Sequence, residues 1–343
     1  MKNKKLNAII YAITAALFYA INVPCSKLLL ETVAPTFMAG FLYIGAGIGI
    51  GTMYIFHYKK EKKKERLEKK DILYTVGMIV LDIIAPILLM IGINKGTSSN
   101  ASLLGNFEIV ATTIIALILF HEKVNKRLWA AIGFITLSSI ILSFGGKGSF
   151  DFSIGSLFVL GATFCWGLEN NCTRSISEKS TYQIVTIKGY CSGTGSLIVA
   201  LCIGEKFPEI KYILPALILG FVAYGLSIFT YIKAQKTLGA SKTSAYYATA
   251  PFISALLSVV ILHESITVNY IISLIIMTVG TVIVVCDTLI HSHNHEHEHK
   301  ITHTHDGSTH THIITHTHEH NHYINDMIHK HKHDILLSNH SPI

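Results

Sequence analysis

The sequence predicts an all-α integral membrane protein, and three observations lead to that fold class. Half of the 343 residues are apolar, only 14% are Asp, Glu, Lys or Arg, and the mean hydropathy is +0.46. A typical soluble domain has about 25% charged residues. The apolar residues also lie in blocks of roughly the 20 residues that a helix needs to cross a bilayer core of about 30 Å. This composition excludes a soluble enzyme, a disordered chain and a nucleic-acid-binding module.

Ten apolar segments predict ten transmembrane helices. The first follows a short basic N-terminus and stays apolar to Leu30, which is longer than the core of a cleaved signal peptide, so we interpret it as a retained span. Short polar links such as 31–35, 94–99 and 145–151 end the segments and place neighbouring helices antiparallel in a bundle. In order, the segments cover 8–30, 36–57, 71–93, 100–120, 128–144, 154–176, 182–204, 212–234, 243–263 and 267–289, and the fifth is the shortest.

The distribution of Lys and Arg predicts the orientation in the membrane. Eight of the 28 basic residues lie in the single link 59–70. With the N-terminus inside, the cytoplasmic segments hold 18 Lys and Arg residues and the outer links hold four, namely Lys95, Lys147, Lys206 and Lys211. Cytoplasmic loops are enriched in Lys and Arg. We therefore predict that both termini are cytoplasmic and that the chain is a multi-pass protein of the cell (plasma) membrane.

The two halves of the apolar region repeat one another. Residues 18–27 match 165–174 at an offset of 147, which pairs Tyr19 with Trp166, and the sequence Leu-Phe-His-Glu at 119–122 matches Ile-Leu-His-Glu at 261–264. A repeat with an odd number of spans must invert its second copy, and inverted repeats support alternating access with a site near the bilayer midplane. We predict one five-helix repeat over 1–145, a second over 146–289, and a tail over 290–343.

The pattern resembles the EamA-like, ten-helix group of the drug/metabolite transporter superfamily. The resemblance rests on residues 16–22, on Asn106-Phe107-Glu108 with the apolar run to Glu122, and on residues 248–251 with the run to Glu264. It covers about 8–289. It implies a carrier of a small solute, often an exporter, and leaves the solute open.

Polar and aromatic residues inside the apolar segments are the candidates for a substrate site. A charge at bilayer depth costs at least about 2.5–3.5 kcal/mol on insertion scales, so each charge needs a reason. The candidates are the charged residues Asp82, Glu108, Glu169 and Lys188, the amides Asn22 and Asn106, and the repeat-paired aromatic residues Tyr19 and Trp166.

Each candidate also has a structural alternative. Glu108 handles substrate or a proton, or it pairs with Lys188 or hydrogen-bonds between helices. Asp82 binds substrate or is neutral and hydrogen-bonded. Lys188 neutralises a carboxylate of the substrate, snorkels to the interface or pairs with Glu169. Tyr19 and Trp166 line a cavity or pack in the core.

Stripes of glycine in the second and seventh segments predict close contact between helices. Gly47 and Gly51, and Gly189 and Gly193, have the G-x-x-x-G spacing that allows such contact. Packing within the chain is the first interpretation, and a homodimer face is the alternative.

The tail is rich in histidine and is predicted to be disordered because it has no apolar core. Residues 291–343 contain 17 of the 20 histidines, mostly as H-x-H. Neutral imidazole binds Zn²⁺, Ni²⁺, Co²⁺ and Cu²⁺. The candidate ligands are His291, His293, His295, His297, His299, His303, His305, His310, His312, His316, His318, His320, His322, His329, His331 and His333. The tail captures metal for a pore, senses metal, buffers it, or responds to pH.

We predict a secondary transporter of small polar metabolites that works by alternating access. The alternatives are a carrier of Zn²⁺, Ni²⁺ or Co²⁺, and a membrane metal sensor or store that transports nothing. Outside the His-rich tail the sequence contains no H-E-x-x-H motif, and it contains no nucleophile motif and no phosphate-binding G-x-x-x-x-G-K-[ST] loop, so we predict neither an enzyme nor a nucleotide-driven pump. No cofactor is expected beyond metal ions on the tail. The expected partners are the lipid bilayer and a small solute.

Overall fold

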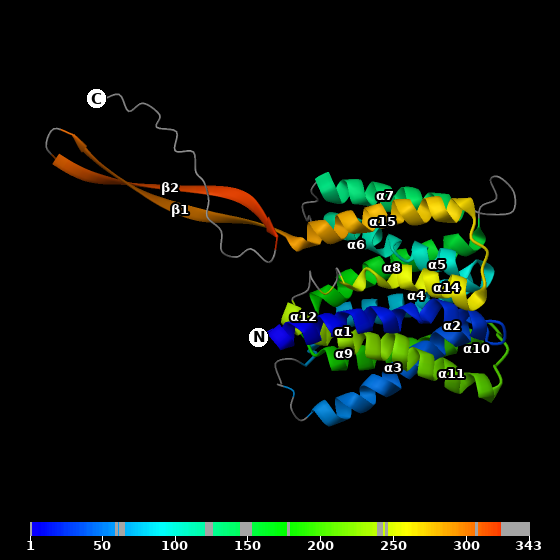
Figure 1. The fold of residues 1–343 in the computed structure, drawn as a ribbon. Helices are drawn as coiled ribbons and strands as arrows, with labels where there is room; N and C mark the ends of the chain where they lie inside the picture. Colours follow the sequence, from blue (N-terminus) through cyan, green and yellow to red (C-terminus); the bar gives the residue numbers. More distant parts are fainter. Residues whose placement is uncertain are drawn as a thin grey trace. The chain divides into compact units, whose positions relative to one another are not determined.

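The computed structural model describes residues 2–58, 61, 66–120, 126–144, 153–176, 179–238, 243, 246–305 and 308–323. It divides into two units, 1–285 and 286–343. Within the first unit all described regular structure is helical, and the helices run side by side along a common direction (Figure 1).

Helices of the first half follow the five predicted segments in order. They are α1 (Lys2–Ala20), α2 (Asn22–Leu29), α3 (Pro35–His57), η3 (Lys69–Asp71), α4 (Ile72–Lys95), α5 (Ser98–Leu104), α6 (Phe107–Phe120) and α7 (Lys126–Ser143). The break between α1 and α2 has a local cause. Pro24 has no N–H to donate to the carbonyl of Ala20 four residues earlier, and α1 ends at Ala20.

Helices of the second half follow the remaining segments. They are α8 (Ile154–Ser175), α9 (Thr181–Ile187), η4 (Lys188–Ser192), α10 (Gly193–Cys202), α11 (Ile210–Gly220), η5 (Phe221–Leu226), α12 (Ser227–Leu238), α14 (Ala250–Leu262) and α15 (Val268–Leu289). Both η4 and η5 are short π-helical stretches inside longer helical segments. Such bulges occur frequently at functional sites.

Seven helical segments among the described residues are long and apolar enough to cross a bilayer. They cover Leu6–Leu29, Pro35–His57, Lys69–Lys95, Lys126–Ser143, Thr181–Cys202, Ile210–Tyr231 and Val268–Cys286. The other three predicted segments fall short for visible reasons. The fourth is interrupted between α5 and α6, the sixth carries Glu169, Asn170 and Asn171 in α8, and α14 in the ninth has only 13 residues. The chain is therefore a multi-pass membrane protein.

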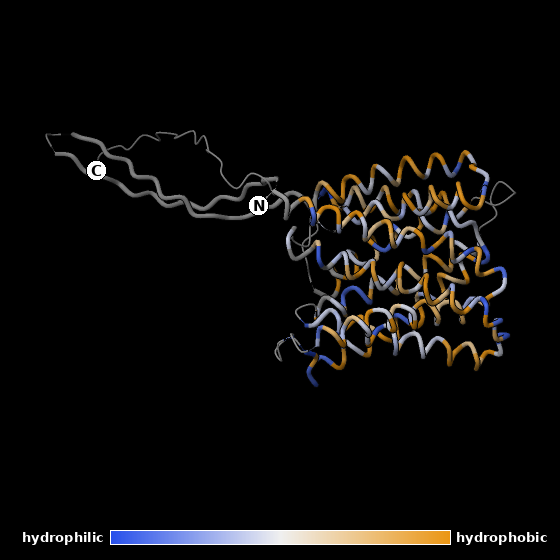
Figure 2. Tube along the Cα trace, turned by 60° about the horizontal axis from the view of Figure 1, so that its bottom comes forward, coloured by the Kyte–Doolittle hydropathy of each residue, from blue (hydrophilic) through white to orange (hydrophobic). Residues whose placement is uncertain are grey.

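Hydropathy along the bundle agrees with a membrane location. Figure 2 shows hydrophobic residues over the length of the helices and hydrophilic residues gathered toward the two ends of the bundle. Large apolar side chains such as Phe56, Leu73 and Ile210 are more than two-thirds exposed. Exposed apolar surface on this scale marks contact with lipid or with another protein.

The glycine stripes pack inside the chain, where α3 crosses η4, α10 and α11. A Cβ built on Gly189 would lie 2.4 Å from the Cα of Gly47, and one built on Gly45 would lie 2.1 Å from the carbonyl oxygen of Leu217. These contacts leave no room for a methyl group. They confirm close helix packing within the chain and do not support a separate homodimer face.

Replacing Gly189 by Ala is expected to destabilise the bundle. The new methyl group would meet backbone atoms of α3, and overpacking a filled core typically costs about 1–3 kcal/mol. Gly133→Ala on α7 is the matched control because a Cβ at Gly133 meets nothing within 4 Å. Thermal unfolding in detergent micelles checks this, and equal melting temperatures for the two variants would contradict it.

The second unit contains a two-stranded antiparallel ribbon, where the sequence predicted a disordered tail. Strand β1 (Ile290–His305) pairs with β2 (Ser308–Tyr323), with Ile290 opposite Tyr323 and His305 opposite Ser308. The physical reason is the period of two in the H-x-H pattern, which matches the alternation of a strand.

Some predicted features lie outside the described residues. They are His121 and Glu122 of the first repeat motif, the junction of the two predicted repeats at 145–146, the candidate ligands His329, His331 and His333, and the isolated His340.

Candidate functional site

Three of the predicted site residues meet inside the bundle. The ammonium group of Lys188 lies 2.8 Å from Oε1 of Glu169 and 3.1 Å from Oδ2 of Asp82. The side chains of Asp82 and Glu169 are 0% and 3% exposed, and that of Lys188 is 15% exposed. Asp82 comes from α4, Glu169 from α8, and Lys188 is the first residue of η4. We call these three residues the charged cluster. Of the alternatives predicted for Lys188, the structure shows the ion pair with Glu169, and it shows a second ion pair with Asp82.

Hydrogen bonds hold the two carboxylates of the charged cluster in place. The hydroxyl of Tyr43 on α3 donates to Oδ1 of Asp82 at 3.0 Å. The hydroxyl of Thr173, one turn along α8, donates to Oε1 of Glu169. Buried charges are tolerated when they are both paired and hydrogen-bonded. The cluster meets both conditions, which fixes its geometry.

A second, uncharged group continues from Tyr43. The ring of Tyr43 lies 5.2 Å from that of Tyr224 in η5. The hydroxyl of Tyr224 accepts a 3.2 Å hydrogen bond from Nδ2 of Asn22, and Ser26 donates to Oδ1 of Asn22 at 3.1 Å. Asn22 and Glu169 occupy equivalent places in the sequence repeat. The polar groups around Asn22, in the first repeat, are therefore uncharged, whereas those around Glu169, in the second repeat, are charged.

Glu108 lies apart from the charged cluster and hydrogen-bonds between helices. Its Oε1 accepts from Nδ2 of Asn170 on α8 at 2.7 Å, and the same Nδ2 is 3.3 Å from the hydroxyl of Thr112. No Lys or Arg within the described side chains lies at ion-pair distance from this carboxyl. Its contact with α8 is the hydrogen bond between helices that was one of the alternatives predicted for Glu108.

Aromatic rings surround these polar groups. Tyr19 packs against Tyr224 at 6.1 Å and Tyr247 at 5.8 Å between ring centroids. Trp166 is 8% exposed and lies beside Tyr43. Neither Tyr43 nor Tyr224 was a candidate from the sequence. Tyr19 was a candidate because the repeat pairs it with Trp166. The position of Tyr43 and Tyr224 inside apolar segments is the signal that could have found them.

Asn106 is buried at the break between α5 and α6. Its Nδ2 donates a long 3.4 Å hydrogen bond to the carbonyl of Leu103. Its Oδ1 has no hydrogen-bond partner among the described residues. The structure does not bring Asn106 into contact with the charged cluster, but it leaves a buried acceptor free near Glu108.

Polar contacts join the two halves at the end of the bundle where α2 ends. The carboxylate of Glu205 accepts from the backbone N–H groups of Thr36 and Phe37 at 3.0–3.1 Å. The carboxylate of Glu264 accepts from those of Ser98 and Ser99 at 2.6 and 2.8 Å. Each therefore satisfies free N–H groups at the start of a helix in the other half. We call Glu205 and Glu264 the end clamps.

A cavity lies at this same end. Its volume is about 310 Å³, and residues 30–35 with 206–209 supply most of its lining. The ammonium group of Lys27 on α2 caps the neighbouring C-terminal end of α4, because it donates hydrogen bonds to the carbonyl groups of Ile93 at 2.6 Å and Gly96 at 2.8 Å.

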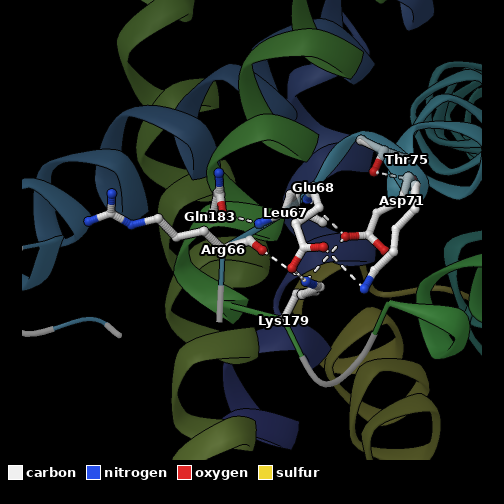
Figure 3. A network of polar contacts seen from close by, with 8 residues as sticks. Arg66, Leu67, Glu68, Asp71, Thr75, Lys179 and Gln183 are labelled. Atoms are coloured by element: carbon white, nitrogen blue, oxygen red, sulfur yellow. Dashed lines mark hydrogen bonds and ion pairs between the residues drawn. The ribbon is translucent and has the colours of Figure 1, made fainter. Parts of the chain in front are cut away.

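Another network joins the halves at the opposite end (Figure 3). The ammonium group of Lys179 lies 2.8 Å from Glu68 and 3.4 Å from Asp71, and it donates to the carbonyl of Arg66 at 3.0 Å. The side chain of Gln183 accepts from the N–H of Leu67 at 2.9 Å. The hydrogen bond from Lys179 lowers the pKa of the exposed Glu68 carboxyl. Both ends of the bundle thus hold polar contacts between the halves.

The membrane part offers little for a metal. Among the described side chains of the helical bundle, no group of three or more His, Cys, Asp or Glu is arranged to hold an ion. His57 and His263 lie at helix ends, away from the charged cluster. The described bundle therefore gives no support to divalent metal as its cargo.

A family model settles the relationship of the chain. The model of the EamA-like transporter family matches residues 6–144 and again 153–286. The chain belongs to the EamA-like transporter family. This confirms the predicted resemblance, and the two matches fall close to the two predicted repeats. The family and the names of its members point to transport rather than to catalysis.

Relatives of this EamA-like protein carry transporter names. A protein of Methanothermobacter thermautotrophicus named an uncharacterized transporter is 27% identical over 302 residues, covering 82% of this chain and 86% of the relative. The uncharacterized transporter YyaM of Bacillus subtilis is 23% identical over 266 residues, covering 74% and 86%. A solved crystal structure superposes with a TM-score of 0.59 at 15% identity, covering 80% of this chain and 95% of the other, which shows the fold alone.

Proposed function

We propose that this EamA-like protein is a secondary transporter that moves small polar metabolites across the cell membrane by alternating access. The observation that carries the proposal is the charged cluster, three ionisable side chains from two halves of a membrane-embedded bundle. Ionisable groups at this depth are rare and mark pathways for substrates or ions. Export is the direction that the family resemblance favours.

The proposed architecture is ten helices in two inverted five-helix repeats, with both termini inside. The pattern of helix contacts supports it. The contact between α1 and α12 has its repeat counterpart in the contact between α8 and α4. The contact between α6 and α8 corresponds in the same way to the contact between α14 and α1. The contact between α3 and α11 corresponds to the contact that α4 makes with η4 and α10, which are consecutive parts of one helical segment. Each pair relates a first-half span to its predicted repeat mate, as a two-fold relationship between the repeats requires.

The proposed site binds a metabolite that carries charge. Lys188 suits a substrate carboxylate that takes the place of Asp82 or Glu169 beside its ammonium group. Glu108, which has no described cationic partner, suits an ammonium group. The rings of Tyr19, Tyr43 and Tyr224 give flat apolar walls with hydroxyl groups at their edges. Asn22 and Trp166 extend these walls. A solute with both charges would use both parts of the site.

Alternating access requires contacts between the halves to break at one end while they hold at the other. The end clamps supply such contacts at one end, and the network around Lys179 supplies them at the other. In this proposal, the end clamps close the transporter at one end of the bundle and the network around Lys179 closes it at the other.

Exchange in proteoliposomes tests the proposal. Vesicles loaded with pools of zwitterionic, anionic and cationic metabolites should exchange at least one labelled solute faster than protein-free vesicles. Divalent metal flux is measured in parallel with the full chain and with a chain truncated after Leu289. If metal crosses in both forms and no metabolite does, the metabolite carrier is wrong and the metal carrier is right.

Glu108→Gln is expected to reduce metabolite exchange at least ten-fold without loss of folded yield. The amide keeps the oxygen that accepts from Asn170 and removes only the charge. Glu209→Gln is the matched control because Glu209 lies in an outer link, where it pairs with Lys211. Initial rates in proteoliposomes at equal protein density check this. Unchanged exchange in Glu108→Gln would return this carboxyl to a structural role.

A further inference from the structure

The pairing of β1 with β2 gathers the tail histidines on one face of the ribbon. Residues opposite one another in an antiparallel pair share a face, and faces alternate along each strand. The histidines of β1 are all at odd positions and those of β2 all at even positions, and the register pairs odd with even. Thirteen histidine positions therefore share one face. They are 291, 293, 295, 297, 299, 303 and 305 on β1, and 310, 312, 316, 318, 320 and 322 on β2.

Four histidine pairs in this register are consecutive. His291 is opposite His322, His293 opposite His320, His295 opposite His318, and His297 opposite His316. Directly opposite residues have Cα atoms about 4.5–5.5 Å apart. Next-but-one residues on a strand are about 6.8 Å apart. Two adjacent pairs thus form a compact quartet of histidine positions.

We propose that these four pairs form two divalent-metal sites, each built from four histidines across the ribbon. The first quartet is His291, His293, His320 and His322, and the second is His295, His297, His316 and His318. Four nitrogen ligands complete the coordination of a structural Zn²⁺. Zn²⁺, Co²⁺, Ni²⁺ and Cu²⁺ all accept imidazole, whereas Ca²⁺ and Mg²⁺ prefer oxygen.

Metal supplies a free energy that the ribbon otherwise lacks. The opposite face holds mostly Ser, Asn, Glu, Thr and Lys, so neither face is apolar. An isolated two-stranded ribbon is marginally stable at best in water. Metal binding to a site absent from the unfolded chain contributes directly to folding. A shift of one residue in register would move one strand's histidines to the other face, so metal also selects this register.

The second quartet ends where the pattern changes. Beyond His297, His299 is opposite Ile314 and Ile301 is opposite His312. These two isoleucines interrupt the ladder of histidine pairs, and only His303 and His310 form a further pair. The register therefore predicts two strong sites, whereas a disordered string of histidines would bind metal in proportion to its histidine count.

Zn²⁺ titration calorimetry on the full chain in detergent micelles tests this, with the chain truncated after Leu289 as background. The wild type should bind two Zn²⁺ tightly. His293→Ala with His320→Ala removes two ligands from one quartet and should leave one tight site. His293→Ala with His318→Ala removes one ligand from each quartet and should weaken both sites at least ten-fold.

His329→Ala with His331→Ala is the matched control, because it removes two histidines beyond β2 and should keep both tight sites. All three double variants lose the same number of histidines. Equal losses of Zn²⁺ binding in all three would overturn the quartets in favour of a disordered string. Absence of tight Zn²⁺ binding to the wild type would overturn the metal sites altogether. Neither result depends on what the membrane part transports.

Discussion

Lys188→Met is expected to lower the free energy of unfolding by about 3–5 kcal/mol, the usual cost of removing one partner from a buried ion pair. The reason is the pair of carboxylates that it leaves behind. Asp82 and Glu169 both face the Lys188 ammonium at 3.1 Å or less, and both side chains are almost fully buried. Without the cation, each carboxylate must take up a proton or remain as an unpaired charge at bilayer depth.

A charge-neutral variant separates stability from transport. Adding Asp82→Asn and Glu169→Gln to Lys188→Met removes all three charges with similar side-chain volumes. Replacing a whole buried ion cluster by uncharged groups is often close to neutral for stability. We expect the triple variant to recover most of the thermal stability of the wild type and to show no metabolite exchange.

Thermal unfolding in micelles and exchange in proteoliposomes distinguish the outcomes. Lys211→Met is the control, since Lys211 pairs with Glu209 in an exposed link where ion pairs contribute little. A triple variant that is stable and still transports would assign the charged cluster to structure alone. A Lys188→Met variant that melts like the wild type would mean that the cluster contributes no pairing energy.

The membrane part of the fold was largely predictable from the sequence. Apolar segments of bilayer length give the helices, and Pro24 explains why the first segment breaks at Ile21. The repeat also guided the site, because Asn22 and Glu169 are equivalent in sequence and both are buried beside polar partners. Charge at bilayer depth is a strong signal, since so few residues have it.

The partners of these residues were not predictable in the same way. Asn22 and Tyr224 are 202 positions apart, and Tyr43 reaches Asp82 from another helix. Sequence periodicity gives the face of a helix but not the helix that it meets. The ribbon of the tail was missed for a different reason. The lack of an apolar face argued for disorder, whereas the period-two pattern itself is compatible with paired strands.

Removing an end clamp is expected to open one end of the bundle. In Glu264→Gln the charge that holds the N–H groups of Ser98 and Ser99 is lost, and hydrogen bonds to charged groups contribute about 1.5–3 kcal/mol. Glu205→Gln acts in the same way on Thr36 and Phe37. We expect amide hydrogen exchange at the affected pair to rise by about ten-fold or more, since each 1.4 kcal/mol is a factor of ten in the opening equilibrium.

Amide hydrogen exchange measured by mass spectrometry distinguishes a clamp from a simple helix cap. A cap would affect only the helix that it ends. A clamp joins the two halves, and both clamp contacts must break when that end of the bundle opens. Either variant should therefore also raise amide hydrogen exchange at the backbone N–H groups that the other clamp holds. Glu209→Gln, in the same link as Glu205, should change neither pair. If the two clamps respond independently, the end does not open as a unit, and the gate must lie elsewhere in the bundle.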